Sequence, residues 1–250
     1  MYDPTHVFCI AGVTVTKQQG SGLVKVIAVC GQKGGIGKTS VSMNLAAAMS
    51  KHSKILVMDV DPQGSTMFWA ETADDVENEL PFDTSPSTDP EALRHLKSLN
   101  EYDAIIVDTP GSLRDEDVLG AVLDLADFAI LPITTSTLDF PAITRTLNEF
   151  VIPRGVPYKL LLNKVDTRRG QKRLDGWKQA IDEGEFVADR IGVPRFNHHI
   201  RLSSTVEDMP MEGKVVTQYT DTRANQNAIF DYTAVALELT AQWYEEAKAN

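Results

Sequence analysis

A glycine-rich stretch in the first fifth of the chain carries the residues best suited to chemistry. It has the sequence Gly-Gln-Lys-Gly-Gly-Ile-Gly-Lys-Thr-Ser from Gly31 to Ser40, directly after an apolar run and at the start of a helix-like segment. Glycines let backbone N–H groups turn inward around phosphates, and a helix amino terminus adds positive potential. In such a loop Lys38 reaches the β- and γ-phosphates and Thr39 ligates Mg²⁺. We therefore predict a nucleotide site formed by Gly34, Gly35, Ile36, Gly37, Lys38, Thr39 and Ser40.

Aspartates follow two later apolar runs. Asp59 and Asp61 stand at the end of one of these runs, and Asp108 ends the run Ala104–Val107. The carboxyl ends of parallel strands lie where α/β sheets bind their ligands. We predict that Asp108 holds the hydration shell of Mg²⁺ and that the stretch Thr109–Asp115 senses the γ-phosphate. Asp59 has an alternative role, because an aspartate at such a place can cap a turn.

The elements that must position these residues follow a regular order. Short apolar runs alternate with helix-patterned segments, which is typical of strands joined by crossover helices into a mostly parallel sheet. The runs are continuous rather than alternating, as expected for strands covered on both faces. We predict a doubly wound α/β fold with helices on both faces and strands at Val24–Cys30, Ile55–Met58, Ala104–Val107, Phe128–Ile133 and Lys159–Leu162.

The domain organisation follows from length and from local composition. A chain of 250 residues suits one α/β domain, which we place at residues 23–250. Residues 1–22 have no clear period and end in Gln-Gln-Gly-Ser-Gly, so we expect a flexible lead-in or a start placed too early. The stretch Pro81–Pro90 is rich in turn-forming residues and predicts a surface connection, followed by a helix at Glu91–Leu99.

Composition narrows the class of protein. Only two cysteines are present, no apolar run approaches the ~20 residues of a membrane span, and no signal peptide is recognisable, so we expect a cytoplasmic protein. The five histidines lack ligand-like spacing and predict no metal site. A formal net charge of −11 argues against a protein that coats nucleic acid with its whole surface.

The glycine-rich stretch resembles a known family. A usual phosphate loop has glycine where Gln32 stands, and here Lys33 adds a second lysine. This deviant form resembles the ParA/MinD family of ATPases, most closely the small ParA-type partition ATPases that lack a helix-turn-helix domain. The resemblance implies ATP as the nucleotide and a homodimer that forms on ATP binding. It also implies that Lys33 crosses the dimer interface and acts with Lys38 and Asp61 in catalysis.

Further roles are implied by the same resemblance. Asp59 lies by the Mg²⁺ site in that family, together with Thr39 and Asp108, and Asp61 orients the attacking water. Asn163 matches an asparagine that pairs with adenine, and Pro210 matches a proline that packs on the base. The run Asn163-Lys164-Val165-Asp166 also matches the guanine-reading pattern of GTPases, so the identity of the base stays open on this motif alone.

The resemblance implies a molecular switch that positions plasmids or chromosomes. Its ATP-bound dimer would bind a surface, and slow hydrolysis would be stimulated by a ParB-like or other adaptor protein with a basic segment. An orphan cargo-positioning ATPase and a metabolic or electron-transfer enzyme, such as dethiobiotin synthetase or a nitrogenase-type iron protein, are the alternatives. A MinD-like membrane switch is disfavoured, because Phe230–Asn250 is acidic and its apolar positions predict a core-packing face.

A basic cluster predicts non-specific DNA binding, which would make the ATP-bound form nucleoid-associated. Between Lys159 and Lys178 the chain has seven basic residues and two acidic ones, so cations are concentrated in an acidic molecule. Two such clusters on one face of a dimer would add their phosphate contacts. We predict DNA contacts from Arg168, Arg169, Lys172 and Arg173, with Arg201 nearby. The alternative is a solvated charged face.

Overall fold

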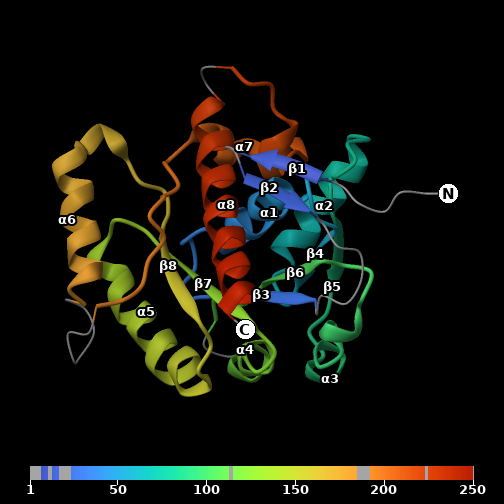
Figure 1. Cartoon of the computed structure of the whole chain (residues 1–250), viewed down its shortest axis with the longest axis horizontal. Coiled ribbons are helices and arrows are strands. Elements are labelled where there is room, and N and C mark those ends of the chain that lie inside the picture. The colour runs from blue at the N-terminus through green and yellow to red at the C-terminus, as the bar shows by residue number, and fades with distance from the viewer. Residues whose placement is uncertain are drawn as a thin grey trace.

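The computed structural model describes residues 7–10, 13–16, 24–112, 115–184, 192–222 and 225–249. Its centre is a six-stranded parallel sheet with the order β5-β4-β6-β3-β7-β8 (Figure 1). The strands are β3 (Lys25–Val29), β4 (Ile55–Asp59), β5 (Asp83–Pro86), β6 (Ala104–Asp108), β7 (Phe128–Ile133) and β8 (Tyr158–Leu162). The prediction of a doubly wound, mostly parallel sheet is confirmed.

Helices cover both faces of this sheet. They are α1 (Lys38–Met49), α2 (Ser65–Asp75), α3 (Pro90–Leu93), α4 (Glu116–Leu123), α5 (Phe140–Thr146), α6 (Gln171–Asp182), α7 (Ser204–Glu212) and α8 (Gln226–Ala249). Shorter turns of 3₁₀ or π-helix lie at Leu96–Ser98, Thr137–Asp139, Leu147–Val151, Ile152–Arg154, Thr167–Arg169 and Val216–Gln218. Among the described residues, no helix is both long enough and apolar enough to cross a membrane.

Alternation along the central strand explains why the sheet is covered on both sides. Val26 and Ala28 of β3 belong to one buried cluster, which also holds side chains of α4, α5 and α6. Ile27 and Val29 belong to a second cluster, formed largely with α1, α2 and α8. Neighbouring side chains of a strand point to opposite faces, so each face of β3 has its own core. The carboxyl end of this strand is thereby fixed at the centre of the molecule, where the glycine-rich loop begins.

The last helix has the role predicted for it. Tyr232, Val235 and Leu239 of α8 are buried in the second cluster, and Ile229 is partly buried against it. The helix packs along α1, whose first residue is Lys38 of the glycine-rich loop. Its apolar face therefore contributes to the core.

Three local expectations differ from the structure. The predicted connection at Pro81–Pro90 contains β5, a polar strand at the edge of the described sheet that pairs with β4. The predicted helix at Glu91–Leu99 is divided into α3 and a separate 3₁₀ turn. Within the predicted lead-in, β1 (Val7–Ile10) and β2 (Val13–Thr16) form an antiparallel pair. An edge strand needs little apolar content, so the pattern of apolar residues in the sequence did not predict β5.

Candidate nucleotide-binding site

A cavity of about 700 Å³ opens at the carboxyl ends of the central strands. Its volume lies within the range of small-molecule sites. The lining residues come from the glycine-rich loop, from the two segments that follow β4 and β6, and from the segment after β8: Gly34, Gly35, Gly37, Lys38, Thr39, Ser40, Asp61, Pro62, Gln63, Ser65, Gly111, Ser112, Asp115 and Lys164. The structure thus brings most of the predicted loop residues together with Asp61.

The loop is held in shape by Asn163. Gly37 has a left-handed backbone with φ of 88°, and a side chain there would lie 2.4 Å from Asn163 Nδ2. That nitrogen donates a hydrogen bond to the carbonyl of Ile36 at 2.8 Å, and Asn163 Oδ1 accepts from the N–H of Lys164 at 2.9 Å. Both halves of the amide therefore stabilise the loop and its neighbour. The predicted contact of Asn163 with a base stays a prediction.

Lys38 points across the loop. Its Nζ donates to the carbonyl of Lys33 at 3.2 Å, and a Cβ atom on Gly111 would lie 2.9 Å from the same nitrogen. Gly111 thus leaves room for the lysine to extend into the cavity. Burial lowers the pKa of Lys38, and the carboxylates of Asp108 and Asp61 oppose that shift. These two carboxylates favour the protonated, cationic form of Lys38 at the place where phosphate would be bound.

Asp108 connects three elements. Its Oδ2 accepts hydrogen bonds from Thr39 Oγ1 at 2.7 Å and from Thr66 Oγ1 at 3.0 Å, while Oδ1 accepts from Ser42 Oγ at 3.3 Å. Burial raises the pKa of Asp108 to about 6 despite these bonds. A buried carboxylate beside a threonine hydroxyl at the start of a phosphate-loop helix has the oxygen chemistry that Mg²⁺ prefers. The described donor set thus fits the predicted metal site at Thr39 and Asp108.

Asp59 caps a turn, which is the alternative role considered for it from the sequence. Its side chain is buried, with Oδ1 accepting from the N–H of Asp61 at 3.1 Å and Oδ2 from the N–H of Met67 at 3.1 Å. Burial raises the pKa of Asp59, whereas the backbone hydrogen bonds oppose the increase. The carboxylate therefore closes the turn between β4 and α2 and directs Asp61 toward the cavity. A contact of Asp59 with Mg²⁺ stays a prediction.

Lys33 has a partner that the sequence did not indicate. Its Nζ lies 2.5 Å from Asp139 Oδ1 and donates to the carbonyl of Leu138 at 2.9 Å. The Asp139 side chain is only 3% exposed, and its other oxygen accepts from the N–H and the hydroxyl of Thr134 at 2.8 and 2.6 Å. In this conformation Lys33 is held by residues of its own chain.

A smaller cavity of about 190 Å³ adjoins the loop. Ser40, Asn163, Pro210 and the buried Tyr232 are among its lining residues, so the predicted base-packing proline lies beside the predicted base-pairing asparagine. Asp166 does not line this cavity. A hydrogen bond from Arg168 holds the pKa of Asp166 below its usual value, although partial burial opposes this. Asp166 instead lines an adjoining cavity with Arg168 and Arg201, so the identity of the base stays a prediction.

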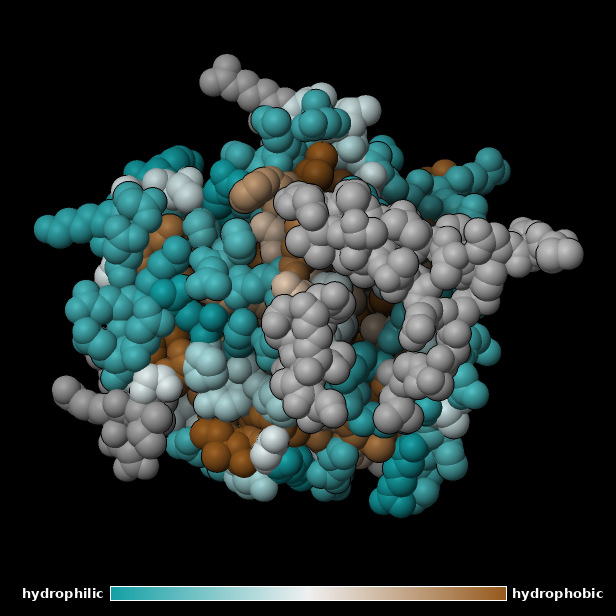
Figure 2. All heavy atoms as spheres, in the orientation of Figure 1, coloured by the Kyte–Doolittle hydropathy of each residue, from teal (hydrophilic) through white to brown (hydrophobic). Residues whose placement is uncertain are grey.

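The predicted DNA residues divide into two groups. Arg168 and Arg169 have side chains 83% and 58% exposed, and Lys172 and Arg173 are exposed at the first turn of α6. In Figure 2 the region over α6, at the left of the molecule, is mostly hydrophilic. Arg168 forms a bidentate ion pair with Asp166, but its own side chain stays exposed. Arg201 is more deeply held, because it is 27% exposed and its guanidinium forms a bidentate ion pair with Asp231, which is 4% exposed. The structure therefore argues against Arg201 as a DNA contact.

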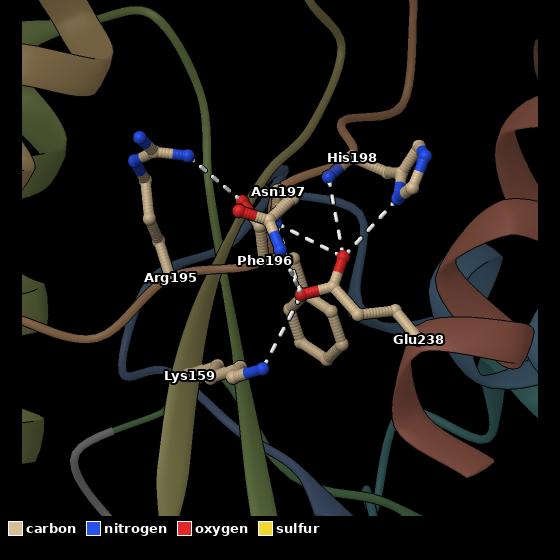
Figure 3. Close-up of polar contacts among 6 residues, drawn as sticks. All are labelled: Lys159, Arg195, Phe196, Asn197, His198 and Glu238. Carbon is tan, nitrogen blue, oxygen red and sulfur yellow. Dashed lines mark hydrogen bonds and ion pairs between the residues drawn. The ribbon is translucent and has the colours of Figure 1, made fainter. Parts of the chain in front are cut away.

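Lys159 is also withdrawn from the basic cluster. Its Nζ lies 3.3 Å from Glu238 of α8, whose carboxylate also accepts from the N–H groups of Asn197 and His198 (Figure 3). Glu238 is 11% exposed, so these bonds are largely shielded from water. The cation at position 159 joins the last helix to the sheet.

The fold and the cavity are those of a phosphate-loop nucleotide-binding domain. Residues 27–224 match the family model described as the CobQ/CobB/MinD/ParA nucleotide binding domain. The maintenance of carboxysome distribution protein A of Gloeobacter kilaueensis is 35% identical over 219 residues, which are 88% of this chain and 95% of that protein. The chain therefore belongs to the CobQ/CobB/MinD/ParA family, and the predicted ParA/MinD resemblance is confirmed.

Solved structures agree on the fold. A putative plasmid partition protein of Borrelia burgdorferi bound to AMPPNP has a TM-score of 0.65 and 19% identity, covering 88% of this chain and 99% of that chain. Cobyrinic acid a,c-diamide synthase of Mycobacterium smegmatis, with bound ADP and magnesium, has a TM-score of 0.61 and 20% identity, covering 89% of this chain and 96% of that one. At these identities the likeness concerns the fold alone.

Proposed function

We propose that the chain is an ATPase of the positioning type, whose ATP-bound homodimer binds DNA without sequence specificity and is released when a partner stimulates hydrolysis. The observation that carries this proposal is the arrangement around one cavity, with Lys38, Asp61 and the Thr39–Asp108 pair beside a loop that also supplies Lys33. A second lysine in the loop serves no purpose for phosphate binding within one subunit when it points at Asp139. Lys33 would serve phosphate binding if it left Asp139 and reached the nucleotide of a second subunit.

The residues have separate tasks in this proposal. Backbone N–H groups from Gly34 to Ser40 and the ammonium of Lys38 bind the phosphates. Thr39 and Asp108 would hold Mg²⁺, which supplies charge neutralisation on the phosphates when bound. Asp61 lies in the cavity with its Oδ1 fixed by the N–H of Gln63 at 3.0 Å, and it would orient the attacking water.

Adenine is the base we propose. The 190 Å³ cavity beside Ser40 continues from the phosphate cavity, since Ser40 and Lys164 line both. Pro210 offers an apolar surface there, and Asn163 retains one N–H and one lone pair beyond its bonds to the loop. Comparing the affinities of labelled ATP and GTP tests this directly. Equal affinities would contradict the choice of adenine.

The relative, rather than the site, bears on the cargo. The relative at 35% identity is named for the maintenance of carboxysome distribution, which supports a cargo other than a plasmid or chromosome. The adaptor would then be a protein that links this ATPase to such a cargo, with a basic segment that suits the acidic chain. A cargo of this kind is our second candidate beside plasmid or chromosome partition.

Turnover distinguishes a positioning switch from a metabolic enzyme. The proposal predicts slow hydrolysis by the purified protein, because a partner completes the site, and no need for a small-molecule co-substrate. The test measures phosphate release with and without DNA, alongside size-exclusion chromatography in ATP and ADP. Rapid hydrolysis by the protein alone, or a monomer in ATP, would contradict the proposal.

The DNA surface we propose is the start of α6 with the turn before it. Arg168, Arg169, Lys172 and Arg173 place four exposed cations within six residues. Anisotropy with random-sequence duplex DNA across a salt series compares wild type with Arg168→Ala/Arg169→Ala/Arg173→Ala in ATP and in ADP. Each lost phosphate contact should reduce the log–log salt slope by roughly 0.9. Equal binding in both nucleotides, or an unchanged slope in the triple variant, would refute this surface.

A further inference from the structure

The exposed sides of α2 and α7 form an acidic surface with apolar side chains among the carboxylates. Phe68, Val76 and Met211 are 55%, 52% and 74% exposed. The carboxylates are all exposed and come from the second half of α2, the turn after it, and α7: Glu71, Asp74, Asp75, Glu77, Glu79, Asp208 and Glu212. We call this set the α2–α7 surface.

The spacing of these residues places charge and apolar area together. Phe68, Glu71 and Asp75 follow one another at three and four residues, so they share a side of α2 opposite the buried Trp69 and Ala73. On α7, Met211 stands three residues after Asp208 and lies away from the buried Met209. Each helix therefore presents a large apolar side chain next to a carboxylate.

The surface is built on a fixed support. Trp69 Nε1 donates to the carbonyl of Lys214 at 3.0 Å, and Asn78 Nδ2 donates to the carbonyl of Gly213 at 2.6 Å. A side chain on Gly213 would lie 2.6 Å from the Cα of Ala73, so the end of α7 is in direct contact with α2. The two helices are thus held together by a close backbone contact and two hydrogen bonds.

Most carboxylates of this surface form no ion pair with the described residues. Across the residues that the structure describes, the only ion pair made by these carboxylates is the one between Glu212 and Lys214, at 3.7 Å. Carboxylates that are gathered around exposed Phe and Met side chains, and that outnumber the one lysine paired with them, create a negative potential over an apolar area. A surface of this composition fits a ligand that is basic and apolar at once.

We infer that the α2–α7 surface is a docking site for a basic amphipathic helix of a partner protein. A second copy of this chain would bring the same carboxylates against themselves, and nucleic acid or an anionic membrane would be repelled for the same reason. A helix with lysines or arginines around aliphatic residues matches both the charge and the helical spacing of Phe68, Glu71 and Asp75.

Such a partner would act close to the nucleotide site. Helix α2 begins at Ser65, which lines the 700 Å³ cavity, and its second residue, Thr66, donates to Asp108. The docking itself does not depend on the proposed ATPase function, so the two can fail separately.

A peptide of defined design tests the docking site directly. The probe is a labelled peptide of leucines and lysines with leucine at helical spacing, and its control has the same composition without that period. Its affinity is measured by anisotropy at physiological salt, without nucleotide. The variants are Glu71→Gln/Asp75→Asn/Asp208→Asn and Phe68→Ser/Met211→Ser. The matched control, Glu91→Gln/Glu149→Gln/Glu183→Gln, removes the same charge from exposed carboxylates on other elements.

The expected result is that each α2–α7 variant weakens binding by about tenfold, as the loss of three exposed charge pairs or of two apolar contacts implies. The control variant and wild type should bind alike, and the peptide without helical period should bind more weakly. An equal loss in the control variant, equal binding of both peptides, or no binding of the periodic peptide overturns the inference. A nucleotide-free dimer that dissociates in Phe68→Ser/Met211→Ser would identify a second copy as the occupant and would also overturn it. Unchanged affinity of all variants for labelled ATP verifies that the nucleotide site is intact.

Discussion

Replacing Asp139 with asparagine should strengthen ATP-dependent dimerisation. In the proposed dimer Lys33 reaches a nucleotide of the second subunit, which requires it to leave Asp139, so their ion pair would act against that dimer. The side chain of Asp139 is 3% exposed and that of Lys33 is 32% exposed. An ion pair with one partner in contact with water contributes roughly 1 kcal/mol, less than a fully buried pair. A dimer releases two such pairs, so the variant should lower the dimer Kd roughly 30-fold.

Sedimentation over a concentration series with a non-hydrolysable ATP analogue measures this effect. The matched control is Asp127→Asn, because Asp127 also has one oxygen on a lysine, Lys97, and the other on a backbone N–H, that of Val26. That variant should leave the dimer Kd unchanged. The combined variant Asp139→Asn/Lys33→Ala should stay monomeric if the effect acts through Lys33. A folded Asp139→Asn protein with an unaltered or weaker dimer would refute the reasoning.

Three further predictions follow from the site and its supports. Lys38→Ala should abolish binding of labelled ATP, whereas Lys33→Ala should bind ATP and remain monomeric in size-exclusion chromatography; dimerisation of the latter would contradict the role of Lys33. Asp61→Ala should bind Mg-ATP and dimerise without turnover, because the orientation of water matters only in the transition state, and undiminished phosphate release would exclude that role. Glu238→Gln should lower the melting temperature by roughly 4–8 °C, from a loss of roughly 2 kcal/mol, while Glu91→Gln should not. Burial alone would raise the pKa of Glu238, but hydrogen bonds from Asn197 and His198 hold it below its ordinary value of 4.5. This contribution is therefore present at neutral pH and lost as the pH falls through the folded-state pKa, so thermal unfolding below pH 4.5 should show a smaller difference between variant and wild type.

The strands of the sheet could be predicted where burial on both faces forces an apolar run. Phe128–Ile133 is found with the predicted bounds, and the other four predicted strands differ by one residue at one end or at both. β5 lies at the edge, where Asp83–Pro86 needs no apolar run, and no sequence period marks it. The same physics that makes central strands visible in a sequence makes edge strands hard to find.

The site was predictable where a recognisable local motif marks its residues. Loop residues that bind phosphate are adjacent in sequence, so their spacing carries the information. The partner of Lys33 is separated from it by 106 positions, and a single aspartate before a phenylalanine and a proline has no distinguishing pattern. The bracing role of Asn163 depends on the left-handed backbone of Gly37, which becomes visible only in three dimensions.

Thr66→Val should disconnect α2 from the nucleotide site. Thr66 and Thr39 share Oδ2 of Asp108, so a change at Thr39 when nucleotide and metal bind must alter the hydrogen bond that holds the first turn of α2. A hydrogen bond to a charged group contributes roughly 1.5–3 kcal/mol, enough to bias the position of a helix. Trp69 reports on that helix, because it is buried in α2 and its Nε1 bonds to Lys214.

The measurement is the change in Trp69 fluorescence on addition of Mg-ATP, in a Trp177→Phe/Trp243→Phe background that leaves Trp69 as the reporter. Wild type should show a change, and Thr66→Val should show a much smaller one at saturating nucleotide. Ser42→Ala is the matched control, since Ser42 bonds to the other oxygen of Asp108 and lies on α1 rather than α2. If the two variants respond alike, the shared oxygen of Asp108 does not connect the nucleotide to α2. A partner on the α2–α7 surface would then have to influence hydrolysis through the turn that carries Asp61 and that Asp59 closes.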